Sequence, residues 1–319
     1  MINIKNSTIL VTGGAGFIGS HLVKELASLS AKVVVLDIEI NPKSLFVSDG
    51  VYRYCEFVIA DLRDKGVVNK VFEQYLPQYV FHLAAEPLVE KSFDNPYNAF
   101  ETNIMGTVNV LESCRRLNSV SAVIVASSDK AYGKTKKPYT EDFPLRGDHP
   151  YDVSKSSADL ISYAYYKSYG LPVVITRFGN VYGEGDLHMN RIIPGICEAI
   201  IKKKILEIRS NGKYVRDYLY VKDVVDGYIF LISKISSVAG EAFNFSSNDT
   251  LSVLDLVKRM EKILKTKIKY KILNTAKNEI PYQHLVDSKI RRLGWKTKYN
   301  LYSSLQQIFD WYKYDFYKN

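Results

Sequence analysis

The sequence predicts an α/β protein with a doubly wound parallel sheet, followed by a smaller C-terminal lobe of α+β structure. Between residues 8 and 178, short apolar runs that suit buried strands alternate with stretches of helical periodicity. A glycine-rich turn follows the first of these runs. The alternation stops after residue 179. We therefore expect one domain over residues 1–179 and another over residues 180–319, with part of 220–246 returning to complete the sheet.

Length and composition are those of a globular protein with a large core. The chain has 319 residues, of which 46% are hydrophobic and 24% are charged. No run approaches the ~20 apolar residues of a membrane span, and the N-terminus shows no signal peptide. Cys55, Cys114 and Cys197 are scattered, outside metal-binding spacings. We expect a cytoplasmic protein with neither a structural metal nor a membrane partner.

The net charge of +9 is concentrated in the C-terminal third, where residues 200–319 hold 23 Lys and Arg against 12 Asp and Glu. Such a surplus can attract a nucleic acid or a small polyanion such as a nucleotide diphosphate. It is equally typical of a solvated helix, and Lys258, Lys262 and Lys265 have helical spacing. Because the sequence contains no zinc finger, heptad repeat or RNA-recognition motif, we expect no nucleic-acid partner.

The first predicted strand leads into a glycine-rich turn over residues 12–19. Gly13, Gly16 and Gly19 have the spacing at which a backbone turns tightly against a pyrophosphate. A helical pattern follows, and the N-terminus of a helix favours negative charge. This strand, turn and helix predict a Rossmann-type dinucleotide site.

Asp37 ends the second predicted strand, about 20 residues after the glycines. At that distance an acid binds the ribose hydroxyls of NAD. The next three residues, 38–40, contain no Arg for the 2′-phosphate of NADP. The sequence therefore predicts NAD as the cofactor.

Two further strands end in residues that suit the same site. The third predicted strand ends in Asp61 and Leu62, and the fourth leads into Ala84 and Ala85, whose small side chains would let a cofactor pass close to the backbone. His82 lies within the apolar fourth strand. We expect its side chain to be packed, or hydrogen-bonded to the backbone, rather than catalytic.

The regular part of the chain is predicted to contain six strands and three well-marked helices. The expected strands are at 8–11, 32–36, 57–60, 79–83, 122–126 and 173–177, and the expected helices are at 20–29, 97–117 and 153–169. Ligands of such sheets bind outside the carboxyl ends of the strands. The strand at 122–126 therefore delivers the residues that follow it to the site.

Ser128 follows that strand, and Tyr151 and Lys155 lie four apart on one helical face. An ammonium near a phenol can lower the pKa of the phenol and make it a usable base. The hydroxyl of Ser128 can share a hydrogen bond with the same substrate oxygen. This trio can take a proton from a sugar hydroxyl while a nicotinamide takes the hydride.

The chain after residue 179 is predicted to form a mixed lobe. The expected helices are at 191–203, 221–232, 253–264 and 301–312, and the expected short strands are at 206–208 and 217–220. The boundary contains no linker. We therefore expect the two parts to enclose one cleft, where ligands commonly bind.

Taken together, these residues resemble the extended short-chain dehydrogenase/reductases that act on nucleotide sugars. The resemblance covers nearly the whole chain and also includes Asn103, residues 216–221 and residues 293–295. It implies these cofactor contacts: Gly13, Gly16, Phe17, Ile18, Gly19, Asp37, Asp61, Leu62, Leu83, Ala84, Ala85, Asn103, Tyr151 and Lys155. It also implies that Asn180, Arg191, Arg209 and Arg216 bind the substrate.

The triplet Ser128-Asp129-Lys130 distinguishes groups within that family. It is similar to the triplet of CDP-glucose 4,6-dehydratases, as are residues 86–89, 148–151 and 179–186. Residues 139–141 and 216–221 instead have the form shared by dehydratases and epimerases in general. The resemblance thus implies a 4,6-dehydratase and leaves the nucleotide base open.

The implied reaction gives each member of the triplet a role. Tyr151, with Lys155 and Ser128, takes the proton of the hydroxyl at carbon 4, and Asp129 protonates the hydroxyl that leaves carbon 6. Lys130 either removes the proton from carbon 5 or acts as a charged group that stabilises the enolate. The alternatives are an NAD-dependent 4-epimerase and, more remotely, a non-catalytic binding protein for nucleotides or nucleic acid.

The resemblance also implies a homodimer. Helices near 97–117 and 152–169 form a four-helix bundle between subunits in this family. Small and apolar residues such as Ala158 and Ile161 are compatible with that arrangement.

Overall fold

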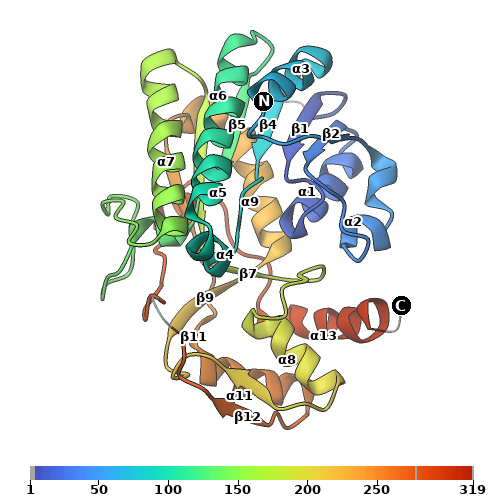
Figure 1. Ribbon diagram of the computed structural model, residues 1–319, viewed down its shortest axis with the longest axis vertical. Helices are drawn as coiled ribbons and strands as arrows, with labels where there is room; N and C mark the ends of the chain where they lie inside the picture. Colours follow the sequence, from blue (N-terminus) through green and yellow to red (C-terminus); the bar gives the residue numbers. More distant parts are fainter. Residues whose placement is uncertain (1–3, 277–278, 318–319) are drawn as a thin grey trace.

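The computed structural model describes residues 4–276 and 279–317. It has two parts (Figure 1): a large sheet with helices on both faces, and a smaller lobe of short strands and helices beside it. The predicted fold class is therefore confirmed.

Seven parallel strands form the large sheet, in the order β10-β6-β5-β4-β1-β2-β3. The strands are β1 (Thr8–Thr12), β2 (Lys32–Asp37), β3 (Cys55–Ile59), β4 (Tyr79–His82), β5 (Ala122–Ala126), β6 (Val173–Phe178) and β10 (Ala242–Phe245). Strands that are buried on both faces have continuous apolar sequences, and for this reason the central strands could be predicted from the sequence. β10 lies within 220–246 and pairs with β6 at the edge of the sheet.

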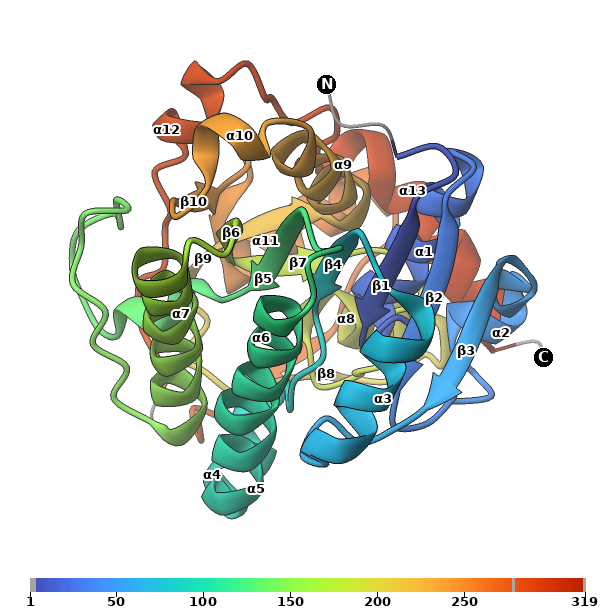
Figure 2. The same ribbon diagram turned by 90° about the horizontal axis from the view of Figure 1, so that it is seen from above.

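Helices cover both faces of this sheet (Figure 2). On one face lie α3 (Lys65–Tyr75), α6 (Gly106–Arg116) and α7 (Pro150–Tyr169), and on the other lie α1 (Phe17–Ser28) and α9 (Val221–Ser233). Parallel strands require such crossover connections. A separate apolar cluster is buried on each face. These two clusters fix the sheet that positions the site.

Two helices begin earlier than predicted, and both carry site residues. α7 begins at Pro150 rather than at residue 153, because proline is favoured at the first helical position. α1 begins at Phe17, directly after Gly16. The first turn of each helix therefore lies closer to the carboxyl ends of the strands than the periodicity indicated.

The predicted helix over 97–117 is present, and a π-helical turn lies inside it. This stretch consists of α5 (Pro96–Phe100), a π-helical turn η2 (Glu101–Met105) and α6. Such π turns inside helices occur frequently at functional sites. This one contains Asn103.

The smaller lobe has its own apolar cluster between two small sheets and three longer helices. Its sheets are β11-β9-β7, formed by β7 (Asn180–Tyr182), β9 (Val215–Tyr220) and β11 (Thr250–Ser252), and β12-β8, formed by β8 (Leu206–Ile208) and β12 (Tyr270–Ile272). The longer helices are α8 (Ile192–Ile201), α11 (Val253–Leu264) and α13 (Leu301–Trp311). Phe17, at the start of α1, packs against this cluster. The glycine turn thus faces the smaller lobe.

Short elements that the sequence did not indicate complete the chain. They are α2 (Leu45–Ser48), η1 (Val51–Tyr54), α4 (Val89–Asp94), η3 (Asp129–Tyr132), α10 (Ile235–Val238), α12 (Ser288–Arg292) and η4 (Tyr312–Phe316). Within the described residues, the helices are all too short or too polar to cross a membrane. The domain boundary at residue 179 stays a prediction.

Candidate active site

The glycine turn after β1 has the geometry that a dinucleotide needs. Gly13 has φ +71°, and a Cβ at that position would lie 2.7 Å from the backbone nitrogen of Ala84. A Cβ on Gly19 would overlap the carbonyl oxygen of Gly13. Gly16 precedes α1, and among the described residues no side chain caps this helix. A close backbone approach thus meets a helix N-terminus, which suits a pyrophosphate.

Asp37 lies beside this turn at the end of β2. Its carboxylate accepts hydrogen bonds from the backbone nitrogens of Ala15 (3.0 Å) and Ile38 (2.8 Å). Burial raises the pKa of Asp37, while these two hydrogen bonds act against the rise. Asp61, after β3, binds Arg63 instead, and Leu62 is buried in the core. The strand order therefore brings Asp37 to the turn, as the motif predicted.

His82 is a structural residue, although its partners differ from those predicted. Its Nδ1 lies 2.8 Å from the hydroxyl of Thr12, and its Nε2 lies 2.9 Å from that of Thr107. Burial lowers the pKa of His82 to about 3, and the charge of Lys155 adds to this effect. The imidazole is therefore neutral and ties β4 to β1 and α6 through hydroxyl groups rather than through the backbone.

Asn103 occupies the π turn and connects two parts of the site. Its Nδ2 donates to Ser154 Oγ (2.9 Å) and to the carbonyl oxygen of Glu86 (3.2 Å), and its Oδ1 accepts from the nitrogen of Glu86 (2.7 Å). These bonds hold the loop after β4 against α7. A direct cofactor contact by this side chain stays a prediction.

Ser128 lies just beyond the end of β5 and begins a short helix. Its Oγ accepts a hydrogen bond from the nitrogen of Lys130 (3.2 Å) and donates one to Asp129 Oδ1 (3.0 Å). The hydroxyl of Ser128 also acts on the Tyr151 phenol in the first turn of α7, where it lowers the pKa of that phenol. The hydroxyl of Ser128 therefore connects the phenol to the Asp129 carboxylate.

Lys155 lies one turn after Tyr151 but has a different partner. Its Nζ donates to the carbonyl oxygen of Ala126 (2.9 Å), and burial lowers the pKa of Lys155 to about 8. Burial raises the pKa of Tyr151 to about 12, while the hydrogen bond with Ser128 acts in the opposite direction. Burial of the phenol is thus the largest influence on this pKa, and a lowering of it by Lys155 stays a prediction.

Asp129 is the most enclosed acid of the site, with 2% of its surface exposed. Its Oδ1 lies 3.4 Å from the ammonium of Lys130, which is partly exposed. Its Oδ2 accepts a hydrogen bond of 2.8 Å from Nε2 of Gln283. Gln283 comes from the segment between β12 and α12, and no sequence motif indicated it. Asp129 is thus held by groups from both parts of the molecule.

The predicted substrate residues all lie in the smaller lobe or at its edge. Each arginine has a carboxylate partner: Arg216 pairs with Glu279, Arg191 with Asp186, and Arg209 with Glu90 of α4. Arg216 is the most buried of the three. Asn180 lies in β7, paired with β9. Substrate binding by these four residues stays a prediction.

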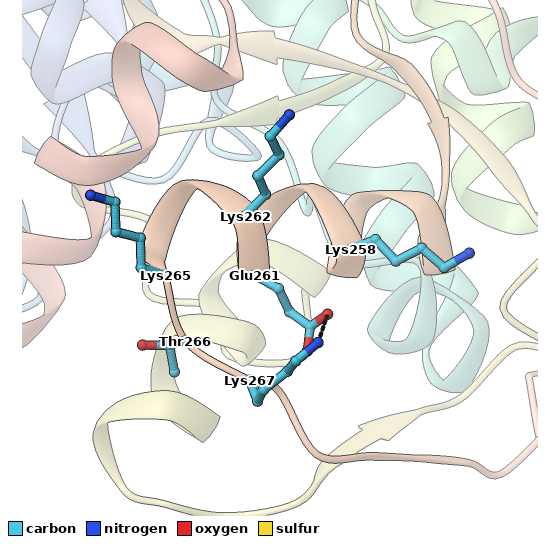
Figure 3. A pocket seen from close by; sticks show the side chains of 6 residues that line it. All are labelled: Lys258, Glu261, Lys262, Lys265, Thr266 and Lys267. Carbon is cyan, nitrogen blue, oxygen red and sulfur yellow. Dashed lines mark ion pairs between the residues drawn. The ribbon is translucent and has the colours of Figure 1, made fainter.

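The basic surface of the C-terminal third does not form an anion site at α11. Figure 3 shows that Lys258, Lys262 and Lys265 point in different directions from this helix, while Lys267 turns back to pair with Glu261. Side chains that diverge in this way do not converge on one phosphate. This arrangement supports the interpretation of a solvated helix surface.

The dinucleotide turn, the acid after β2 and the Ser128, Tyr151 and Lys155 trio define a nicotinamide-dependent enzyme of the short-chain dehydrogenase type. Comparison with known proteins agrees with this class. Residues 9–246 match the NAD dependent epimerase/dehydratase family, and the chain belongs to this family. The predicted cofactor, NAD, is confirmed by membership of this family.

Relatives of both reaction types are similar to the chain. A probable dTDP-glucose 4,6-dehydratase of Sinorhizobium fredii is 31% identical over 327 residues, covering 95% of this chain and 92% of the relative. The structure of UDP-glucose 4-epimerase from Thermotoga maritima with UDP-glucose superposes with a TM-score of 0.87, at 29% identity, covering 96% and 98% of the two chains. A dTDP-glucose 4,6-dehydratase of Streptomyces venezuelae with NAD bound gives a TM-score of 0.85 at 28% identity, covering 96% and 97%. Similarity therefore does not separate dehydration from epimerisation.

Proposed function

We propose that the chain is an NAD-dependent 4,6-dehydratase of a nucleotide-diphosphate hexose, with CDP-glucose as the first candidate. The buried carboxylate of Asp129 carries the proposal. It is hydrogen-bonded to Ser128, which in turn contacts the Tyr151 phenol. An elimination needs an acid that protonates the hydroxyl leaving carbon 6, close to the tyrosine that deprotonates the hydroxyl at carbon 4. An epimerisation needs no such acid.

The glycine turn supports NAD as the group held at β1. The close approach of Gly13 to Ala84, the start of α1 and Asp37 would hold its pyrophosphate and ribose. When bound, NAD supplies an acceptor for the hydride of carbon 4 and a donor for carbon 6. Leu83 and the two alanines after β4 complete the proposed binding surface.

The chain's own residues move the protons. Tyr151 takes the proton of the hydroxyl at carbon 4, and the nearby hydroxyl of Ser128 lowers the pKa of this phenol. Lys155 holds the start of α7 against the end of β5 through Ala126. Asp129 then protonates the hydroxyl that leaves carbon 6. The product is a 4-keto-6-deoxy sugar.

Lys130 acts as a charged group in this proposal. Its Nζ lies 3.4 Å from Oδ1 of Asp129. As an ammonium it stabilises the enolate that arises when carbon 5 loses its proton to water, and a proton from water returns to carbon 5 when carbon 6 receives the hydride. The second role, removal of that proton by a neutral amine, predicts a different response to substitution.

Cations of the smaller lobe bind the diphosphate. Arg216 is the strongest candidate, because its side chain is largely buried and Glu279 balances its charge. Asn180, Arg191 and Arg209 complete the set. Substrate phosphate would take the place of the carboxylate partners of these arginines.

The second candidate function is an NAD-dependent 4-epimerase. It would use Tyr151, Lys155 and Ser128 without elimination, and the similarity to the Thermotoga maritima epimerase favours it. It gives Asp129 no role. Non-catalytic binding is the remote alternative, and the divergent lysines of α11 argue against a nucleic-acid surface there.

A homodimer is part of the proposal. Ala158, which we expected at the interface, is 2% exposed and faces the core of its own subunit, and Ile161 also packs inward. The outward apolar side chains are instead Tyr97 of α5, 73% exposed, and Leu160 of α7, 56% exposed. These side chains form the face that a second copy would cover.

Mass spectrometry of products tests the proposal. The enzyme is incubated with CDP-, dTDP-, GDP- and UDP-hexoses. A product lighter by one water supports dehydration and names the base. A product of unchanged mass with altered chromatographic position would favour the epimerase.

A further inference from the structure

A buried amide of the smaller lobe reaches the candidate acid. Gln283 is 1% exposed, and its Nε2 lies 2.8 Å from Asp129 Oδ2. The other oxygen, Oδ1, is occupied by Ser128 (3.0 Å) and Lys130 (3.4 Å). The two oxygens of Asp129 are therefore held by different parts of the chain.

The backbone around Gln283 is fixed on both sides. The backbone nitrogen of Gln283 donates to the carbonyl oxygen of Val215 (3.1 Å). The backbone nitrogen of Val215 donates to the carbonyl oxygen of Pro281 (3.0 Å). On the other side, the nitrogen of Tyr139 donates to the carbonyl oxygen of His284 (2.8 Å). An amide held in this way has little freedom to move away from Asp129.

The side chain of Asp217 also holds the segment that contains Gln283. Its Oδ2 accepts from the nitrogen of Leu285 (2.7 Å), and its Oδ1 lies 2.9 Å from Nδ1 of His284. Asp217 itself is 2% exposed. Backbone and side-chain contacts thus set the position of Gln283 independently of Asp129.

We propose that Gln283 is a positioning residue that fixes the orientation of the Asp129 carboxylate for proton transfer. Its amide donates to Oδ2 and has no acidic proton of its own to exchange. With Oδ2 held by this amide, the carboxyl group keeps one orientation relative to Ser128 and Lys130. A residue of the smaller lobe, Gln283, thus orients an acid of the larger part, Asp129. This inference rests on the proposed function, because only an elimination uses that acid.

The test removes the donor and keeps the length of the side chain. Gln283→Met is compared with Gln306→Met on α13, where an exposed glutamine bonds to Asp310. Dehydration kcat, substrate KM and the rate of nicotinamide reduction are measured for both. We expect Gln283→Met to lower kcat about 10- to 100-fold, with KM and nicotinamide reduction changed less than about threefold. Gln306→Met should leave all three unchanged.

Coupling to Asp129 separates positioning from a structural role. In an Asp129→Asn background, Gln283→Met should cause no further loss of kcat. A further loss in the double variant, or an equal fall in nicotinamide reduction, would overturn the inference. If Gln283→Met does not fold, Gln283→Asn retains the amide but is too short to reach Oδ2, and the same results are expected.

The wild-type product separates this inference from the proposed function. If the wild type epimerises its substrate and releases no dehydrated product, the proposed function has failed. If the wild type dehydrates its substrate and the substitutions at residues 283 and 129 have additive effects, the proposed function stands and only the inference about Gln283 has failed.

Discussion

The buried carboxylate of Asp129 lies 3.4 Å from the ammonium of Lys130, the residue that follows it in the chain. The two side chains meet because η3 begins directly after β5, with Ser128 as its cap. The pair keeps opposite charges together at the carboxyl end of the central strands. It is also the feature that a plain epimerase would not need.

Asp129→Asn tests the role of the acid. The amide keeps the shape of the side chain but cannot donate an acidic proton, so we expect dehydration kcat to fall about 10²- to 10⁴-fold. Nicotinamide reduction by substrate should continue, because Tyr151 carries that proton. Both rates are measured by product analysis and by nicotinamide absorbance.

The matched control is Asp142→Asn, which makes the same change at an exposed position of the loop after η3. It should behave as the wild type. Dehydration at near wild-type rate in Asp129→Asn would remove Asp129 from the mechanism.

Lys130→Arg and Lys130→Met separate the two roles of that lysine. Arginine keeps the positive charge but does not act as a base, since it stays protonated. If charge alone matters, Lys130→Arg should keep kcat within about tenfold and Lys130→Met should lose more than about 10²-fold. Equal, severe losses in both variants would instead support removal of the carbon 5 proton by the amine.

Arg216→Ala should weaken substrate binding. A buried guanidinium that bonds to phosphate contributes a charge-assisted interaction, so we expect KM to rise about 10- to 100-fold. Lys262→Ala on α11 removes a solvated charge and should change KM less than about twofold. Equal effects of the two substitutions would contradict the assignment.

Asp152, next to Tyr151, predicts a specific pH dependence of stability. Burial raises the pKa of Asp152 to about 6, against the effect of the nearby Lys130 ammonium. Between about pH 4 and pH 6 the folded protein binds a proton that the unfolded chain releases. The protonated Asp152 carboxyl therefore makes its full contribution to the free energy of unfolding below about pH 4. This contribution is lost as the pH rises through about 6.

Asp152→Asn removes that titration. The variant should gain up to about 3 kcal/mol in free energy of unfolding over the wild type at pH 7, and the gain should disappear near pH 4. Denaturant unfolding at several pH values measures the difference, with Asp142→Asn as the exposed control. A gain that does not vary with pH would show that Asp152 titrates normally.

Leu160→Glu tests the proposed dimer. Leu160 is exposed on α7, so a charge there should disrupt a subunit interface but not the fold. Light scattering after gel filtration should give twice the chain mass for the wild type and the chain mass for the variant. The exposed Leu293→Glu is the control, and a monomeric wild type would reject the dimer.

The sequence predicted the sheet well because its central strands are buried on both faces. It also predicted which residues follow β1, β2 and β5, since the glycine turn and the serine-tyrosine-lysine spacing are local. The apolar periodicity of α7 begins at residue 153, whereas the helix itself begins at Pro150, so periodicity alone does not give its start. Helical periodicity likewise cannot show that a π turn interrupts 97–117.

The features of the site that the sequence does not predict depend on contacts between distant segments. Gln283 meets Asp129 across 154 positions, and its own stretch of sequence has no periodic pattern. The partner of Lys155 is a backbone carbonyl, which no side-chain motif reveals. The effect of burial on the Tyr151 phenol likewise depends on the folded surroundings.

Transfer of hydrogen from carbon 4 to carbon 6 tests the central claim most directly. The wild type is incubated with a nucleotide-diphosphate hexose deuterated at carbon 4, and the position of deuterium in the product is read by NMR and mass spectrometry. The account predicts a 4-keto-6-deoxy product with deuterium at carbon 6. A product that keeps all its oxygen atoms and retains deuterium at carbon 4 would contradict it and identify an epimerase.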